Sequence, residues 1–396
     1  SFWTIMGVYL LIKKAFKSSS LALLASLFYA LSYFQIQYAM EARMYALGTF
    51  LVVIASYLLL IALEKRKLGW WALYALAVSL GIYTHYFIAF WTISQAIYVI
   101  CFFRKEFKFA FLSYLMALIS YIPWLPTFFR QFNQVQETYW IPPMNVWSIP
   151  NTLSKMTVGA VVDPGENWPI LVLLMALVAA ASIFFLKKTR TKEKWLFAIQ
   201  FFLPFLITAA LSYKRSIYID RYFIFGFFSY LLILAGAILL INKKFVKLIL
   251  ISAALIGVSI TFPYQWDRLN VEKKPGMAAA AKYINENVKP EEKIFVSSSL
   301  IYFTFKYYNE SEIQAKLYAP GRLPHFSGTA LLSKEDIIVN FSEETIKGYI
   351  VWILNSTGFG NYQPTLPQNW LKEDEKGFEE VNAYQGWIVI AKYKVE

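Results

Sequence analysis

The segment Gln35-Ile36-Gln37-Tyr38-Ala39-Met40-Glu41-Ala42-Arg43-Met44-Tyr45 separates two apolar runs, at about residues 20–39 and 43–63. A carboxylate and a guanidinium at the edge of a lipid bilayer each cost several kcal/mol unless they are paired or hydrated. Glu41 and Arg43 are therefore predicted to line a polar cavity, although a cluster that only anchors an interfacial turn would have the same composition. Because residues two apart point to different sides of a helix, either the helix breaks here or the two side chains serve different partners.

The composition is that of a membrane protein. Hydrophobic residues make up 58% of the 396 residues and charged residues only 16%, against about 25% in ordinary globular domains. The net charge of +13 comes from the apolar part, because residues 1–264 carry 23 Lys and Arg but only 8 Asp and Glu, whereas residues 265–396 carry 15 and 17. The positive charge therefore lies in short loops between apolar runs, and nucleic acid is not predicted as a partner.

The apolar runs predict about nine complete membrane spans and one partial span. A bilayer takes about 20 residues of helix, and the run from Phe2 to Ile12 has only half that length, so we expect the chain to begin inside a span. The run from Leu68 to Phe103 is long enough for two spans, divided at Tyr83-Thr84-His85-Tyr86. The complete spans are expected at about 20–39 and 43–63, as two spans within 68–103, and at about 109–126, 169–186, 195–212, 222–241 and 246–263.

The loops alternate in charge. One set (13–19, 64–67, 104–108, 187–194 and 242–247) holds 17 Lys and Arg, and the other set holds six. Basic loops stay in the cytoplasm, so the Glu41–Arg43 segment, His85, the loops at 127–167 and 213–221, and the C-terminal region are predicted outside.

Two domains are predicted, with residues 1–264 in the membrane and residues 265–396 forming a soluble extracytoplasmic α/β domain. Mixed charge and turn residues begin at about residue 265. The patterns predict helices from Pro275 to about Val288 and at 299–308, strands at 293–297 and 349–354, a capping box at Ser333–Asp336, and a hairpin over 378–394 around Gln385.

Few carboxylates of residues 1–264 are predicted on the outer side. They are Glu41, Glu137, Asp163, Glu166 and Asp220. Arg221 follows Asp220 and could bind phosphate through two parallel hydrogen bonds, pair with Asp220, or reach lipid headgroups. His85 is a candidate hydrogen-bond donor to an acidic ligand, although a histidine in an aromatic belt can also be purely structural.

Several of these motifs together resemble a known family. The ordered matches are Ser32, Tyr38 and Glu41-Ala42-Arg43-Met44-Tyr45-Ala46-Leu47, then Thr84-His85-Tyr86-Phe87 with Gln95, Pro123-Trp124-Leu125-Pro126 before Trp140-Ile141, and Asp220-Arg221-Tyr222. This order is similar to that of bacterial membrane glycosyltransferases with the GT-C fold, of the family-39 or protein mannosyltransferase-like type, which are related to aminoarabinose transferases.

The resemblance implies a multi-pass enzyme of the bacterial cytoplasmic membrane, with its site and its C-terminal domain outside. It would transfer a sugar from a polyprenyl-phosphate donor to a lipid, glycan or protein acceptor among membrane lipids. Arg43, Tyr45, His85, Tyr86, Arg221 and Tyr222 would bind substrate, and Glu41 would be an auxiliary acid. The principal catalytic Asp of this family lies in the first outer loop, which we expect this chain to lack. A divalent metal is a candidate cofactor, but no motif requires one.

Two other functions remain open at this point. A transporter or flippase of polyprenyl-linked lipid would place ionisable groups near the middle of the bilayer, and the predicted spans carry none there. A surface-glycan polymerase or ligase would use the same donor and differ in its acceptor.

Overall fold

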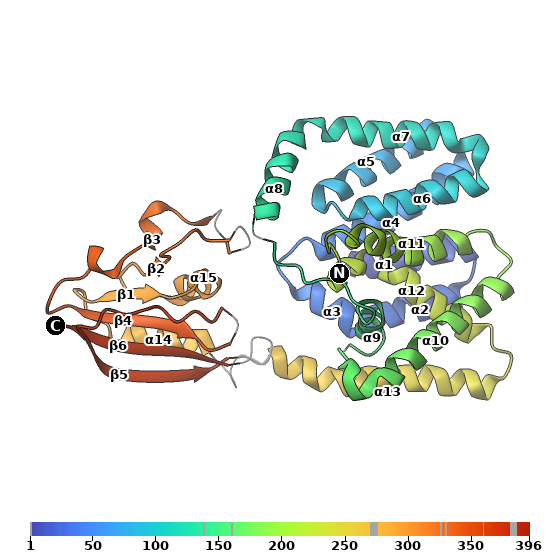
Figure 1. The fold of residues 1–396 in the computed structure, drawn as a ribbon. Helices are drawn as coiled ribbons and strands as arrows, with labels where there is room; N and C mark the ends of the chain where they lie inside the picture. The colour runs from blue at the N-terminus through green and yellow to red at the C-terminus, as the bar shows by residue number, and fades with distance from the viewer. Residues whose placement is uncertain are drawn as a thin grey trace. The chain divides into compact units, whose positions relative to one another are not determined.

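The computed structural model describes residues 2–137, 139–159, 161–269, 276–324, 327–328, 331–358, 360–380 and 386–396, without the side chains of 137, 258–262 and 264–269. The chain forms two compact units, which are described separately (Figure 1). The helical unit contains the residues up to Arg130 together with Trp140–Pro263, and the sheet unit contains Gln131–Tyr139 with Tyr264–Glu396.

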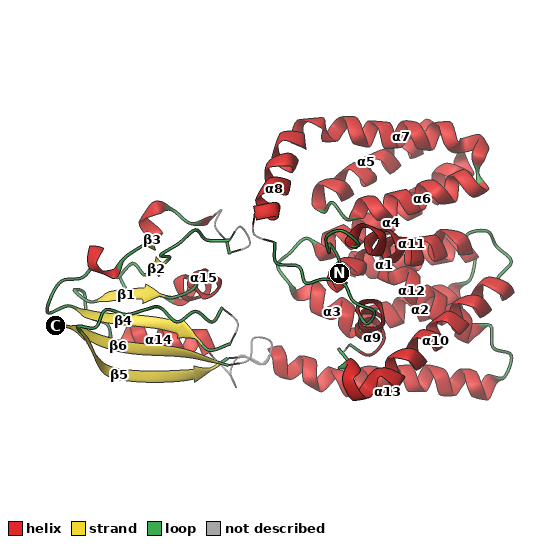
Figure 2. Cartoon of the chain, viewed as in Figure 1, coloured by secondary structure: helices red, strands yellow, loops and turns green. Residues whose placement is uncertain are grey.

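The predicted apolar runs form helices, since a chain in lipid must satisfy its backbone hydrogen bonds internally. Figure 2 shows these helices in red. In chain order they are α1 Phe2–Phe16, α2 Ser19–Leu31, α3 Tyr33–Met40, α4 Tyr45–Lys65, α5 Leu68–Thr84, α6 Ile88–Phe102, η1 Arg104–Glu106, α7 Phe107–Tyr121, η2 Ile122–Trp124, α8 Leu125–Glu137, α9 Ser148–Val158, α10 Pro164–Lys188, α11 Lys194–Ser212, η3 Asp220–Gly226, α12 Phe227–Leu239 and α13 Lys244–Leu269.

Fewer helices than predicted are long and apolar enough to cross a membrane. Within the described residues five pass this test, and a sixth passes if α2 and α3, which meet at a bend of 57°, count as one span. The expected nine complete spans exceed this number partly because the polar waist at residues 83–86 ends α5 and delays α6. These helices have 17 and 15 residues, or about 26 Å and 23 Å of length.

Neutral polar side chains link the helices inside the helical unit. The Ser56 hydroxyl of α4 accepts hydrogen bonds from the amides of Gln95 (3.0 Å) and Gln200 (2.9 Å), and the Tyr74 hydroxyl donates to Gln95 (2.7 Å). Such bonds hold helices together without burying a charge in an apolar environment. Close approach also matters, because a Cβ on Gly226 would lie 2.0 Å from Trp91 Nε1.

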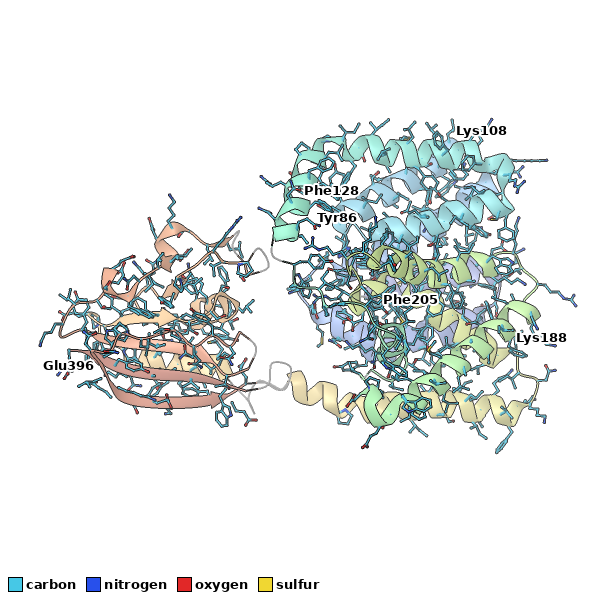
Figure 3. All side chains as sticks on the ribbon, in the orientation of Figure 1. Tyr86, Lys108, Phe128, Lys188, Phe205 and Glu396 are labelled. Atoms are coloured by element: carbon cyan, nitrogen blue, oxygen red, sulfur yellow. The ribbon has the colours of Figure 1, made fainter. Side chains whose placement is uncertain are left out.

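The basic loops gather at one end of the helical unit. Lys14 pairs with Glu64, Arg66 Nε lies 3.0 Å from Glu106, and Lys192 sits 3.6 Å from the ring centroid of Phe103. Figure 3 shows Lys108 and Lys188 at this end, and Tyr86 and Phe128 at the opposite end. The two loop sets distinguished by charge are therefore at opposite ends of the bundle.

The sheet unit contains a mixed sheet with the strand order β3-β2-β1-β4-β6-β5. Strands β1 to β4 run parallel, and β6 lies antiparallel to both β4 and β5. The strands, yellow in Figure 2, are β1 Lys293–Val296, β2 Lys316–Tyr318, β3 Ile337–Ile338, β4 Ile350–Ser356, β5 Trp370–Glu379 and β6 Trp387–Val395. The unit also contains α14 Gly276–Asn287, α15 Ser299–Tyr308, η5 Lys334–Asp336 and η6 Phe341–Glu343.

The predicted elements of the C-terminal region match this unit. The helix at 299–308 is α15, the strands at 293–297 and 349–354 are β1 and β4, and the capping box at Ser333–Asp336 opens η5. Strands β5 and β6 form the predicted hairpin, while Gln385 and Pro275 lie outside the described residues. Buried side chains cover both faces of the sheet and form two cores.

Candidate functional site

The helical backbone breaks within the segment from Gln35 to Tyr45. Helix α3 ends at Met40, the backbone of Glu41 is extended (ψ 129°), and α4 begins at Tyr45. The Arg43 N–H donates to the Glu41 carbonyl (2.7 Å), which closes a tight turn. The Glu41 carboxylate and Arg43 Nε are 4.0 Å apart, with side chains that are 33% and 54% exposed. Both groups can therefore still contact a ligand.

Arg221 is positioned by η3, which packs against α3, α4, α6 and α9. Asp220 does not pair with the Arg221 guanidinium. Its carboxylate forms an ion pair with Lys155 of α9 and accepts a hydrogen bond from the Arg221 backbone N–H (2.7 Å). The guanidinium carbon of Arg221 lies 5.7 Å from the ring centroid of Trp140, and its buried Nε has no hydrogen-bond partner among the described residues.

His85 closes the same site from the α5–α6 turn. Its ring lies 4.7 Å from that of Tyr222, 5.0 Å from Phe225 and 6.3 Å from Tyr45, measured between centroids. Burial, together with the positive charge of Arg221, lowers the pKa of His85 to about 4, so the ring is neutral at pH 7. Because Nδ1 accepts from the Phe87 N–H (3.1 Å), the proton is assigned to Nε2, which can donate.

Arg43 belongs to the same cluster. Partial burial opposes its charge, but contacts with the Tyr45 hydroxyl, Glu41 and Tyr222 outweigh burial and raise the pKa of Arg43 above its usual value. The structure thus brings together six of the seven predicted site residues: Glu41, Arg43, Tyr45, His85, Arg221 and Tyr222. They come from the breaks between α3 and α4 and between α5 and α6, and from η3.

Tyr86 lies in a different cluster. Its hydroxyl accepts a hydrogen bond from Trp124 Nε1 (3.1 Å), and its ring lies 5.2 Å from that of Phe128 and 6.4 Å from that of Tyr121. Tyr86 therefore joins α7 and α8 to the α5–α6 turn instead of facing Arg43 and Arg221.

Three further residues that were not predicted as site residues lie at this cluster. Tyr38 is buried, its ring is 5.4 Å from that of Tyr45, and it is within electrostatic reach of Glu41, Asp220 and Arg221. Lys155 neutralises Asp220, and Trp140 supports Arg221. Tyr38 and Trp140 both belong to the matched motifs and could have been found by that signal, whereas Lys155 carried no comparable signal.

The other candidate carboxylates have structural roles or lie elsewhere. Asp163 caps α10 by accepting from the Gly165 N–H (3.1 Å), Glu166 lies in the first turn of that helix, and the side chain of Glu137 is outside the described part. Within the described residues no group of three or more His, Cys, Asp or Glu side chains is placed to hold a metal ion. Glu41 is thus the carboxylate that stands beside Arg43.

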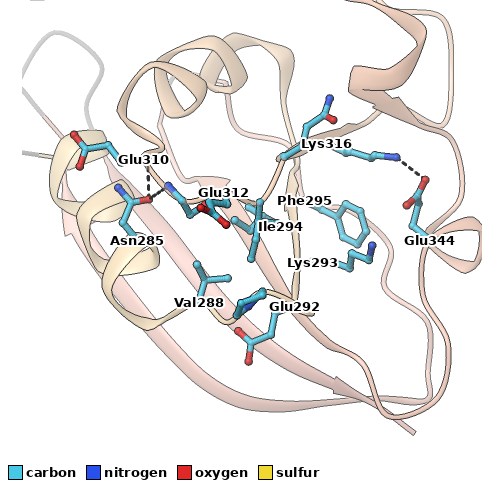
Figure 4. A pocket seen from close by; sticks show the side chains of 14 residues that line it. Asn285, Val288, Glu292, Lys293, Ile294, Phe295, Glu310, Glu312, Lys316 and Glu344 are labelled. Carbon is cyan, nitrogen blue, oxygen red and sulfur yellow. Dashed lines mark hydrogen bonds and ion pairs between the residues drawn. The ribbon is translucent and has the colours of Figure 1, made fainter.

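The sheet unit has a pocket of about 680 Å³ at the amino ends of β1 and β2 (Figure 4). Several of its polar groups already have partners. Lys316 pairs with Glu344 (2.6 Å), the Asn285 side chain accepts from the Glu310 N–H (3.2 Å), and Glu292 accepts from Trp352 Nε1 (2.6 Å). Ligands of open α/β sheets bind at the carboxyl ends of the strands, so this pocket is not a strong candidate site.

Comparison with known proteins places the fold. Residues 1–126 match the model of the dolichyl-phosphate-mannose-protein mannosyltransferase family. None of the curated proteins is significantly similar to this sequence. The crystal structure of ArnT from Cupriavidus metallidurans bound to undecaprenyl phosphate is similar to the structure of this chain, with a TM-score of 0.57 and 12% identity over 98% of this chain and 82% of that chain. The chain is therefore a polytopic membrane protein with a GT-C-like fold similar to that of ArnT, and its first 126 residues match the mannosyltransferase family model.

Proposed function

We propose that this protein transfers a sugar from a polyprenyl-phosphate donor to a lipid, glycan or protein acceptor on the extracytoplasmic face of the bacterial cytoplasmic membrane. One observation carries the proposal: Arg43 and Arg221 come from separate elements to a cluster that also holds the carboxylate of Glu41 and the neutral imidazole of His85. Undecaprenyl phosphate bound to ArnT, which has a similar fold, supports the donor class.

The two arginines suit the phosphate of the donor. When the acceptor oxygen attacks the anomeric carbon, the bond from that carbon to the phosphate oxygen breaks, and the phosphate leaves with the electron pair. Guanidinium groups stabilise this developing charge through charge-assisted hydrogen bonds. Arg221 Nε is buried without a hydrogen-bond partner among the described residues, so a phosphate oxygen would satisfy it. His85 Nε2–H adds a neutral donor.

Glu41 suits the acceptor. As the acceptor hydroxyl attacks, its proton must pass to a base, and a carboxylate within hydrogen-bond reach can accept it or orient the hydroxyl. The Glu41 side chain is one-third exposed beside Arg43, and we assign it the role of an auxiliary acidic residue that orients the acceptor hydroxyl or accepts its proton. The sidedness follows from the loop charges, because this cluster lies at the end of the helical unit opposite to the basic loops.

A turnover assay tests the proposal. Full-length protein in lipid nanodiscs is incubated with labelled polyprenyl-phosphate sugar, and we expect release of free carrier phosphate. The Glu41→Gln and Arg43→Ala variants should lose transfer while expression persists, and Glu64→Gln, a carboxylate at the opposite end, should retain it. Near-normal turnover in either of the first two variants would contradict the assignment.

The same assay separates the alternatives. A flippase would move labelled lipid between the leaflets of vesicles without releasing carrier. The buried polar groups that connect α4, α6 and α11 are the neutral Ser56, Gln95 and Gln200, which gives ion-coupled transport little support. A surface-glycan polymerase or ligase would release carrier only when a glycan acceptor is supplied.

A further inference from the structure

The sheet unit holds two buried polar atoms without partners at the carboxyl ends of its central strands. Ser297 follows β1, and its side chain is 3% exposed, while Asn355 lies in β4 and is 9% exposed. Neither Ser297 Oγ nor Asn355 Oδ1 has a hydrogen-bond partner in the described residues. A buried polar atom without a partner costs about 1–3 kcal/mol, so two together call for an explanation.

The two residues are neighbours on one face of the sheet. Val296 pairs with Leu354 and the Ser297 N–H donates to the Leu354 carbonyl (3.0 Å), so Ser297 lies beside Asn355 at the next position. Side chains alternate between the two faces of a sheet. Ser297 and Asn355 therefore share the face of Phe295 and Ile353, opposite to the core that contains α14 and α15.

Their position is the reversal point of the strand order. Strand β1 has β2 and then β3 on one side, and the chain crosses to the other side of β1 to form β4. In open α/β sheets this arrangement opens a crevice beyond the carboxyl ends of the two central strands, where ligands bind.

Aromatic and amide side chains lie near Ser297 and Asn355 at this end of the sheet. Tyr318 is the next residue in register on β2, and its ring centroid is 6.5 Å from that of Tyr362, which is 42% exposed. The side-chain amide of Asn355 donates through Nδ2 to Oε1 of the exposed Gln363 side chain. The distance of 3.5 Å is the outer limit of a hydrogen bond. None of these side chains is charged at pH 7, so they suit a neutral ligand.

We propose that this edge of the sheet unit, formed by Ser297, Asn355, Tyr318, Tyr362 and Gln363, binds a neutral carbohydrate. Asn355 Oδ1 can only accept, and the Ser297 hydroxyl can donate or accept, so a ligand with several hydroxyl groups satisfies both. The exposed ring of Tyr362 offers an apolar face to the C–H side of a sugar ring, as in sites that combine aromatic walls with a few polar groups. The inference rests on the sheet unit and does not depend on sugar transfer in the helical unit.

The binding experiment uses full-length protein in nanodiscs and methyl glycosides of neutral hexoses, pentoses and N-acetylhexosamines, observed by saturation-transfer NMR. We expect binding of at least one glycoside, weakened about tenfold or more by Asn355→Leu or Ser297→Ala because each removes a hydrogen bond to the ligand. Ser356→Ala is the matched control, since Ser356 is equally buried at the same strand end and points to the opposite face.

Binding should persist in Glu41→Gln and Arg43→Ala, so loss of transfer and loss of this site are distinguishable. Binding by none of the glycosides, or unchanged affinity in Asn355→Leu, would overturn the proposal.

Thermal stability gives a second readout without ligand. A polar atom kept for a ligand is costly in the free protein, so Ser297→Ala should leave the melting temperature unchanged or raise it. Ser356→Ala should lower it, because the Ser356 hydroxyl accepts from the Gly358 N–H (3.2 Å). A loss of stability in Ser297→Ala as large as in Ser356→Ala would show that the hydroxyl is structural, and would also overturn the proposal.

Discussion

The two ends of the helical unit use the same kinds of charged residue in different ways. At the basic end, carboxylates form ion pairs with Lys and Arg side chains of the neighbouring loops, as in Lys14–Glu64 and Arg66–Glu106. At the other end, Arg43 stays 4.0 Å from Glu41, and Arg221 rests on Trp140 while Lys155 neutralises Asp220. Close pairs cancel their fields and fix loops, whereas cations held by aromatic rings and loose contacts keep their attraction for an external anion.

The sharpest way to break this comparison is to remove an arginine from each end. Arg221→Ala should reduce transfer about 100-fold or more, because a donor to the departing phosphate is lost, and Arg43→Ala should act similarly. Arg66→Ala, at the basic end, should leave turnover within about twofold. Initial rates with labelled donor measure this. Equal losses at both ends would mean that the arginines act through stability alone.

The support of Arg221 by packing can be tested without changing a charge. Gly226 closes η3, and an added Cβ would meet Trp91 Nε1 at 2.0 Å and the Gln200 carbonyl oxygen at 3.0 Å. Gly226→Ala should therefore destabilise the protein by about 1–3 kcal/mol and lower transfer as η3 shifts. Gly69→Ala is the control, because an added Cβ at that helical position meets nothing within 4 Å. Melting temperatures and rates of the two variants give the answer, and similar behaviour would refute the tight packing.

The neutral state of His85 predicts a pH dependence that the basic end lacks. The pKa of His85 is about 4 in the folded protein and about 6.5 when unfolded, so the unfolded chain binds the proton more tightly. This contribution to stability is present above pH 6.5 and is lost as the pH falls toward 4, by about 2 kcal/mol between pH 7 and pH 5. In His85→Gln the melting temperature should depend less on pH between pH 7 and pH 5. A slope that persists in His85→Gln would assign it to other groups.

The smallest effect is expected from an exposed pair at the basic end. Lys14 and Glu64 have side chains that are 30% and 53% exposed, and water and salt screen such an ion pair, so it contributes little to stability. Glu64→Gln should shift the melting temperature slightly, and less in high salt, with transfer unchanged. A large loss of transfer in Glu64→Gln would remove the distinction between the two ends.

The neighbours His85 and Tyr86 show where sequence reasoning ended. The motif predicted both as substrate-binding residues, and the break between α5 and α6 was readable because polar residues interrupt an apolar run. Which way each side chain points depends on the turn and on what packs against it. His85 meets Tyr222 of η3, and Tyr86 meets Phe128 of α8, at separations of 137 and 42 residues along the chain.

The sequence by itself determined the membrane class, most of the apolar helices, the charge asymmetry of the loops and several elements of the sheet unit, because these follow from hydrophobicity, turn chemistry and residue period. It also marked Glu41–Arg43 as a polar interruption of the apolar runs, since charged groups stand there only at a cost, but it left open whether the helix breaks. Only the tertiary structure decided that Lys155 forms an ion pair with Asp220, that the Arg221 guanidinium lies over the Trp140 ring, and that Ser297 and Asn355 lie side by side. These are contacts between distant segments, set by packing and strand register, and no local pattern encodes them.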